Sequence, residues 1–205
     1  MTTRKLAVAM MWMAAVVAPV SARPRVTVAV FDRAGLPRQV RETMKKETSQ
    51  IFREAGIELA WVDCETVGAP SAGCVQPLGA TRLRLELVPG RYNRAPHVAG
   101  RAILQGGSSV LFPERVLELA QKASWDFGEL LGHAAAHELG HLLLRSDAHS
   151  PAGIMRASWE VKDLWRLPHA GLIFLPGQLN AVQVAAAPEA SAQAQEDDTS
   201  LGRRF

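Results

Sequence analysis

The residues best suited to chemistry stand at five consecutive positions, His137-Glu138-Leu139-Gly140-His141. Two histidines four residues apart share one face of a helix, so both imidazoles can bind a single Zn²⁺ at about 2.0–2.1 Å. Glu138 then projects beside the open coordination position, where a carboxylate can act as general base toward water. The pattern predicts a hydrolytic zinc site. The structural alternative is a pair of helix histidines satisfied by hydrogen bonds, with a glutamate on the surface.

Such a motif needs a helix to aim both imidazoles, and the run from Phe127 to about Arg145 predicts one, with apolar residues on both sides of the motif. His133 lies on the same face, one turn before His137. At 1.5 Å of rise per residue, however, His133 stands about 12 Å from His141 along the helix axis. That separation is too long for both side chains to bind one metal, so we expect His133 to pack between helices or to support a ligand from behind.

The rest of the chain predicts a small sheet combined with helices. The predicted strands are 26–31, 57–62, 82–88 and 108–112. The predicted helices are 37–55, 114–122, 127–145, 158–166 and 177–186. Residues 89–107 are rich in Gly, Pro and Arg without periodicity and are predicted to form a long loop. The element order up to the zinc motif is therefore a strand, a helix, three strands and then helices.

The zinc motif, followed by Ser150-Pro151 and Gly153-Ile154-Met155, resembles the metzincin group of zincin metallopeptidases. In that group a turn bearing a methionine lies beneath the metal, which implies this place for Met155; the alternative is an ordinary apolar turn residue. The resemblance covers about residues 25–156 and is specific around 133–155. It implies an α+β fold, in which a twisted, mostly parallel small sheet with an edge strand packs on two long helices. Short C-terminal helices follow.

The sequence departs from the family pattern just after the zinc helix. Metzincins usually continue as HExxHxxGxxH, but Leu144 occupies the glycine position and Asp147 the final histidine position. A leucine pays the left-handed backbone penalty that glycine escapes. We therefore expect the helix to continue through Leu144 and Arg145 and to turn at Ser146-Asp147-Ala148 instead.

The position of this turn decides the third metal ligand. His149 is the next available donor after the turn, and its imidazole suits zinc, so we predict His149 as the third ligand. Asp147 is the alternative, because some metzincin-like peptidases use aspartate there. A distant glutamate such as Glu160, as in the gluzincin arrangement, is a further option.

The resemblance implies a zinc metalloendopeptidase with one Zn²⁺ per chain and a peptide or protein substrate. Glu138 is expected to act as general base for a zinc-activated water. In the family, substrate lies along an edge strand above the zinc helix; residues 107–112 match that segment in order, although they could equally form a plain structural strand. Because ligating imidazoles must be neutral, we expect metal affinity and activity to weaken in mild acid. A flat activity profile between pH 5 and 8 would contradict this.

Two hypotheses from other classes remain open. The first is a zinc-stabilised, non-catalytic binding or assembly module on the same fold. The second is an exported interaction domain without metal. Serine or cysteine catalysis is disfavoured, because the sequence has no GxSxG and its two cysteines are better explained as a pair.

The N-terminal segment is typical of a secretory signal. Arg4 and Lys5 precede an apolar run that ends at Val20-Ser21-Ala22, so residues 1–22 are predicted to be cleaved after Ala22; an uncleaved anchor is the alternative. The chain is then secreted or periplasmic. In an oxidising compartment Cys64 and Cys74 are expected to form a disulfide. Residues 23–187 are expected to form one catalytic domain, and residues 188–205 a disordered tail.

The net charge of the chain bears on its possible binding partners. The 205 residues carry 23 basic and 20 acidic side chains, and loss of Arg4 and Lys5 with the signal leaves a net charge of +1. This near-balance gives no electrostatic case for nucleic acid or an acidic membrane surface. We expect a monomer without stable membrane insertion after signal cleavage.

Overall fold

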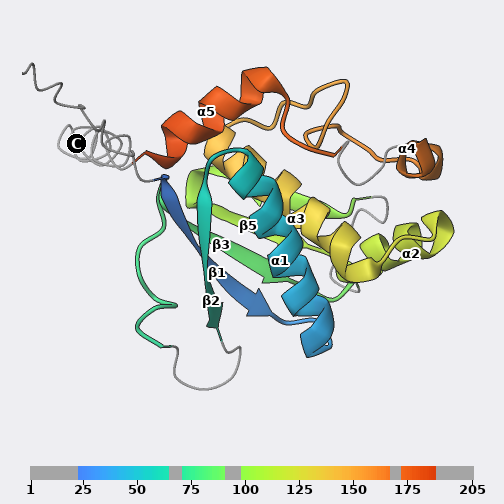
Figure 1. The fold of residues 1–205 in the computed structure, drawn as a ribbon. Helices are drawn as coiled ribbons and strands as arrows, with labels where there is room; N and C mark the ends of the chain where they lie inside the picture. The colour runs from blue at the N-terminus through green and yellow to red at the C-terminus, as the bar shows by residue number, and fades with distance from the viewer. Residues whose placement is uncertain (1–22, 65–70, 91–97, 167–171, 188–205) are drawn as a thin grey trace, which may run out of the picture.

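The computed structural model describes residues 23–64, 71–90, 98–166 and 172–187 (Figure 1). The predicted signal peptide and the predicted C-terminal tail lie outside these residues. The strands are β1 (Arg25–Asp32), β2 (Glu58–Cys64), β3 (Arg82–Leu87), β4 (Gly100–Ile103) and β5 (Ser108–Leu111). The helices are α1 (Arg38–Glu54), α2 (Pro113–Ala123), α3 (Phe127–Leu144), α4 (Val161–Arg166) and α5 (Pro176–Ala186), with a short 3₁₀ turn, η2 (Leu104–Gly106).

The five strands form one sheet in the order β2-β1-β3-β5-β4. All neighbouring pairs are parallel except β4 and β5, which run antiparallel. In β1 the side chains alternate between faces: Val26, Val28 and Val30 enter the main core, whereas Ala29 and Phe31 face the other side. The predicted fold class, a mostly parallel small sheet packed on two long helices, is confirmed.

The sheet differs from the prediction at its edge. We expected residues 89–107 to form a loop, which is wrong for residues 100–106. Of the two alternatives for residues 107–112, the edge strand is wrong and the plain structural strand is confirmed. Residues 100–103 form β4, which pairs with β5, so β5 lies inside the sheet and β4 is at its edge. β4 has only four residues, and pairing with β5 rather than a hydrophobic pattern of its own defines it as a strand.

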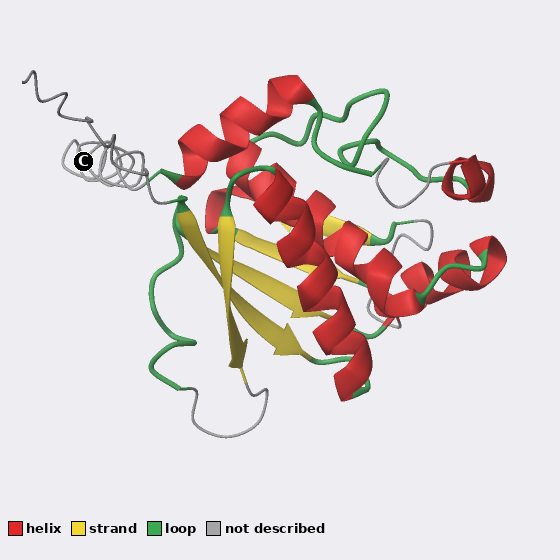
Figure 2. Cartoon of the chain, in the orientation of Figure 1, coloured by secondary structure: helices red, strands yellow, loops and turns green. Residues whose placement is uncertain are grey.

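The two long helices pack side by side on one face of the sheet (Figure 2). Small residues on α3 permit this close approach, because a Cβ at Gly132 would lie 2.6 Å from the Cβ of Glu47 on α1. Thr48 of α1 donates a hydrogen bond from Oγ1 to the Gly132 carbonyl at 3.0 Å and is itself fully buried. This contact fixes α3 at a defined depth and position over the sheet.

The opposite face of the sheet carries a smaller apolar cluster. The predicted disulfide between Cys64 and Cys74 is present and packs there with Ala29, Phe31 and Val62.

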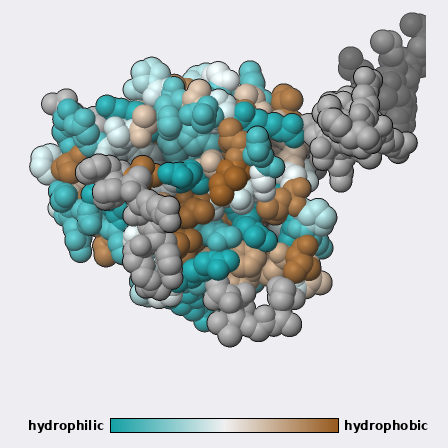
Figure 3. Space-filling view, turned by 180° about the vertical axis from the view of Figure 1, so that it is seen from behind, coloured by the Kyte–Doolittle hydropathy of each residue, from teal (hydrophilic) through white to brown (hydrophobic). Residues whose placement is uncertain are grey.

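Seen from behind, hydrophobic side chains gather in the middle of the surface and are framed by hydrophilic ones (Figure 3). Among the described helices, none combines the length and the apolar character that crossing a bilayer would require.

Candidate metal centre

Helix α3 carries the zinc motif through the middle of the protein. Its start is fixed by Asp126, whose carboxylate accepts a hydrogen bond from the Glu129 backbone N–H at 2.9 Å, as an N-cap residue does. Fifteen of its 18 residues are buried, so α3 is a central helix and not a surface one. Histidines on such a helix have few polar partners and must obtain them from neighbouring segments.

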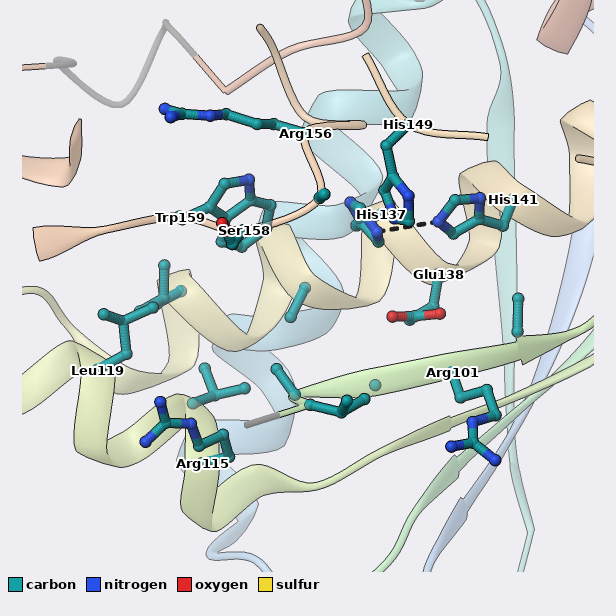
Figure 4. A pocket seen from close by; sticks show the side chains of 18 of the residues that line it. Arg101, Arg115, Leu119, His137, Glu138, His141, His149, Arg156, Ser158 and Trp159 are labelled. Atoms are coloured by element: carbon teal, nitrogen blue, oxygen red, sulfur yellow. Dashed lines mark hydrogen bonds between the residues drawn. The ribbon is translucent and has the colours of Figure 1, made fainter. Parts of the chain in front are cut away.

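Those partners are backbone carbonyls of the segment that follows α3. His137 donates from Nδ1 to the Ile154 carbonyl at 2.7 Å, and His141 donates from Nδ1 to the Ser146 carbonyl at 2.7 Å. A carbonyl can only accept, so the proton of each neutral imidazole is on Nδ1. The two Nε2 atoms therefore carry lone pairs, and they face one another at 3.0 Å, as the dashed line in Figure 4 marks.

His149 completes the group. Its ring lies 5.3 Å from the His137 ring and 4.8 Å from the His141 ring, measured between centroids. One ligand atom from each of these three residues lies within 4.8 Å of the others, which makes them a candidate metal-binding group among the described residues. Asp147 lines the same pocket but is not part of this group, and Glu160 is paired with Lys162 at 2.7 Å.

The donor set fits zinc. Two Zn–N bonds of 2.0–2.1 Å in tetrahedral geometry place their nitrogens about 3.3 Å apart, close to the observed Nε2 separation. Backbone carbonyls on the Nδ1 protons fix the ring orientation and tautomer, which is the usual arrangement around a metal-binding histidine. Three neutral imidazoles also leave one tetrahedral position for another molecule.

The helix ends earlier than we expected. α3 does continue through Leu144, but the left-handed residue is Arg145, with φ of 48°, and not a residue of Ser146-Asp147-Ala148. The N–H of Ser146 bonds to the His141 carbonyl and that of Arg145 to the Leu142 carbonyl, which is the hydrogen-bond pattern of a Schellman motif. This pattern satisfies the last helix carbonyls and holds Ser146 close to the ring of His141.

Met155 lies against α3 at the zinc motif. It is fully buried, and a Cβ at Gly140 would lie 2.7 Å from its sulfur and 2.9 Å from Cε1 of Phe174. Gly140 is therefore needed for close approach, a role that the sequence analysis did not assign to it. The same turn holds the Ile154 carbonyl, which bonds to His137, while Ile154 donates its own N–H to the Ile173 carbonyl at 2.9 Å.

Glu138 lies in the same pocket with only 6% of its surface exposed. Burial raises its pKa to about 8, and the charge of Arg101 on β4 opposes that shift. β4 passes so close that a Cβ at Gly100 would lie 2.5 Å from Oε1 of Glu138. A side chain at this position would displace the Glu138 carboxylate or the end of the Leu111 side chain, a constraint that the sequence does not reveal because residues 89–107 read as a loop.

Burial has the opposite effect on the helix histidines. Desolvation lowers the pKa of His137 to about 4, although the hydrogen bond to Ile154 works in the other direction. Desolvation also lowers the pKa of His141, opposed mainly by its hydrogen bond to Ser146. Both rings are thus kept in the neutral form that binds a metal.

A pocket of about 400 Å³ opens beside these groups. Its walls come from β4, α2, α3 and the segment 147–159, and Figure 4 shows the three histidines at one end of it. Trp159 stands edge-on to His137, with ring centroids 5.8 Å apart. His133 lies outside the candidate group, fully buried against Trp125, so it packs between helices as one of our two expectations for it stated.

Comparison with known proteins shows where this fold has been seen before. Neither the protein-family models nor the curated proteins contain a match to this sequence. Among solved structures, the fold is similar to a zinc-dependent peptidase from Methanocorpusculum labreanum, with a TM-score of 0.52 and 14% identity over 76% of this chain and 99% of that one. It is also similar to archaemetzincin from Methanopyrus kandleri, with a TM-score of 0.51 and 16% identity over 81% of this chain and 98% of that one. The chain thus has a fold found in zinc-dependent peptidases.

Proposed function

We propose that the protein is an exported, monomeric zinc-dependent endopeptidase of metzincin-like type. One observation carries this proposal: three imidazoles from α3 and the following segment converge, with the buried Glu138 beside them, at one end of an open pocket. The zinc-dependent peptidases that share the fold support it. Met155, buried beneath the motif at Gly140, supports the assignment of a methionine turn.

His137, His141 and His149 would hold the metal. When bound, zinc acts as a Lewis acid that polarises a peptide carbonyl and lowers the pKa of water. Glu138 takes a proton from the attacking water as the new carbon–oxygen bond forms at the carbonyl carbon. It then delivers this proton to the amide nitrogen as the carbon–nitrogen bond breaks, and the products are a carboxylic acid and an amine. Its burial favours holding a proton between these two steps.

The edge strand offers the place for the substrate backbone. Among the described strands β4 pairs with β5 alone, so its other side offers backbone N–H and C=O groups to an extended peptide. Gly100 packs directly on the Glu138 carboxylate. A peptide paired with β4 therefore passes close to the proposed general base, and β4 takes the role that we had expected for residues 107–112.

Export is proposed from the N-terminal sequence and the disulfide. Residues 1–22 have the pattern of a signal peptide, and the disulfide between Cys64 and Cys74 suits an oxidising compartment. Expression with the complete N-terminus and N-terminal sequencing of the exported protein test this directly. A chain that begins at Arg23 supports cleavage after Ala22, and a chain that retains the leader contradicts it.

The decisive experiment combines metal analysis with peptide hydrolysis. The purified protein should contain one zinc per chain, and Glu138→Gln should keep the zinc while losing about 10²–10⁴-fold in kcat. His149→Ala should bind zinc more weakly than wild type, whereas Asp147→Ala should bind it equally well; the reverse result would make Asp147 the ligand. If Glu138→Gln keeps zinc and matches wild type in every assay, the protein is a zinc-stabilised binding module and not an enzyme.

A further inference from the structure

The edge strand β4 has two different faces. Its small residues, Gly100 and Ala102, are half-buried and face α3 and the main core. Its large residues, Arg101 and Ile103, alternate with them and are exposed on the other face of the sheet. In Figure 4 the carboxylate of Glu138 and the guanidinium of Arg101 accordingly lie on opposite sides of the strand that carries Arg101. The large side chains of β4 therefore extend away from the proposed general base.

Arg101 has no carboxylate beside it on this outer face, among the described residues. Its neighbour across the pair with β5 is Val110, and the residue opposite Val110 on β3 is Glu86. Strands lie about 4.8 Å apart, so the backbone of Glu86 is about 10 Å away. The carboxylate of Glu86 is also already bound by Arg33 at 3.0 Å. Arg101 thus stands at the unpaired edge of the sheet, with N–H donors available to another chain.

Ile103 continues the same face of β4 two residues further on. It is 48% exposed, and its neighbour across the pair with β5 is the short Ser108. Residues two apart in a strand are about 6.6 Å from one another, so Arg101 and Ile103 present a positive and an apolar group at this spacing. We call these two side chains the outer row of β4.

We propose that the outer row selects peptides in which an acidic residue pairs with Arg101 and an apolar residue two positions away pairs with Ile103. This inference rests on the proposed function, in which an extended peptide adds to β4, and it specifies the substrate class. A peptide in that place turns every second side chain toward the outer row. Opposite charges directly across a strand pair stabilise the pairing, whereas like charges destabilise it.

The position of Gly100 relates the acidic residue to the cleaved bond. Gly100 packs on the carboxylate of Glu138, so the peptide residue opposite Gly100 passes the proposed general base. The residue opposite Arg101 is its neighbour in the peptide. The acidic residue is therefore close to the cleaved bond, and the apolar residue lies two positions further from the bond on the same side.

The first test uses peptides that differ at one position. In a peptide that is cleaved at a single bond, each of the four residues on either side of the bond is replaced in turn by Glu, Gln or Lys. At one of these positions we expect kcat/KM to be about 2–5-fold higher for Glu than for Gln, and about tenfold higher for Glu than for Lys. Two positions further from the bond, Leu should be favoured over Ser. Equal values for Glu, Gln and Lys at every position, or a preference for Lys, would overturn the proposal.

Reversal of the charge at residue 101 connects the preference to β4. In Arg101→Gln the ratio of kcat/KM between the Glu and Lys peptides should fall toward one, and in Arg101→Glu it should invert. Ratios are compared because the charge of Arg101 also acts on Glu138 and so affects every peptide. The matched control is Arg53→Gln, an exposed arginine in the last turn of α1, which should leave the ratio unchanged. A ratio that persists in Arg101→Glu, or that falls equally in the control, would contradict the role of Arg101.

Ile103→Ser tests the apolar half of the outer row. It should reduce the preference for Leu over Ser and leave the ratio between the Glu and Lys peptides as in wild type. Loss of both preferences together would show that the variant disturbs β4 as a whole, and an unchanged preference for Leu would remove Ile103 from the assignment.

Binding separates this inference from the proposed function. Calorimetry with Glu138→Gln protein measures the affinity for the Glu and Lys peptides without turnover. If no peptide is hydrolysed by wild type, but Glu peptides bind more tightly and Arg101→Glu reverses this order, the outer row holds and the peptidase proposal fails. If peptides are hydrolysed and neither rate nor affinity depends on their charge, the peptidase proposal holds and the outer row fails.

Discussion

Helix α3 and the segment 145–156 contribute to the candidate metal centre in different ways. His137 and His141 come from α3, are only 9% and 4% exposed, and have their Nδ1 protons bound by carbonyls. His149 comes from the segment and is exposed. The carbonyls that orient the helix histidines also come from this segment, at Ser146 and Ile154. The helix therefore fixes the position of His137 and His141. The segment fixes the orientation of their rings and supplies His149, which is exposed and free to adapt.

Removal of one ligand at a time gives the largest expected effect. His137→Ala or His141→Ala removes a preorganised donor and should weaken zinc binding by more than the roughly 10–100-fold that loss of an outer partner costs. His149→Ala should weaken it less, because an exposed loop ligand loses conformational entropy on binding and water can take its place. Competition with a chelator measures all three affinities. An equal loss in all three variants would show that the segment is as preorganised as the helix.

The same contrast explains what the sequence could predict. The HExxH spacing, the apolar run around it and the position of His149 are local patterns, and the structure places His149 beside the two helix histidines. The C-terminal helices, predicted at 158–166 and 177–186, are found at 161–166 and 176–186. Both helices were predicted from helical periodicity, which can be recognised along the chain without knowing which segments pack against it.

What the sequence could not predict depends on contacts between distant segments. β4 has no hydrophobic pattern of its own and is defined by pairing with β5. Gly100 and Gly140 look like ordinary glycines until Glu138 and Met155 are seen to pack against them. Arg145 takes a left-handed conformation because the Schellman bonds and the buried helix end outweigh its local preference.

Ionisation of Glu138 should make the metal-free protein, prepared with a chelator, less stable as pH rises. Burial raises its pKa from 4.5 to about 8, so between pH 6.5 and 8 the folded state binds more protons than the unfolded state. The free energy of unfolding should then fall by about 2 kcal/mol across this interval, or about 4–8 °C in melting temperature. The lowered pKa of His137, from 6.5 to about 4, acts in the opposite direction, mainly below pH 6.5 and only weakly above it.

Calorimetric melting at pH 6.5 and 8 measures this difference. In Glu138→Gln the fall should disappear, and zinc should suppress it in the wild type, because a nearby cation favours the carboxylate. A fall of the same size in Glu138→Gln would assign it to other groups.

Gly140→Ala tests the contact between α3 and the turn that carries Met155. Alanine favours a helix by about 1 kcal/mol over glycine, but a Cβ 2.7 Å from the Met155 sulfur overpacks the core by about 1–3 kcal/mol. We expect a net loss of up to about 2 kcal/mol, together with weaker zinc binding, because displacement of the turn moves the Ile154 carbonyl away from His137. Denaturant unfolding and chelator competition measure the two effects.

The control for this variant is Gly177→Ala in α5, where an added Cβ meets no atom within 4 Å. It should leave stability unchanged or slightly higher and should not alter zinc affinity. If Gly140→Ala behaves like Gly177→Ala, the turn can shift without disturbing the histidines.

The smallest effect is expected at the junction between the two regions. Arg145 has φ of 48°, a conformation that costs a non-glycine residue roughly 1–2 kcal/mol. Arg145→Gly relieves that cost but gives the unfolded chain more freedom, so we expect a net gain of about 0.5–1 kcal/mol in the free energy of unfolding. Leu144→Gly, one residue earlier and inside the helix, should instead lose about 1 kcal/mol or more. Denaturant unfolding of the two variants therefore locates the end of the helix. If Leu144→Gly stabilises the protein and Arg145→Gly destabilises it, the turn lies at residue 144, where the metzincin pattern has its glycine.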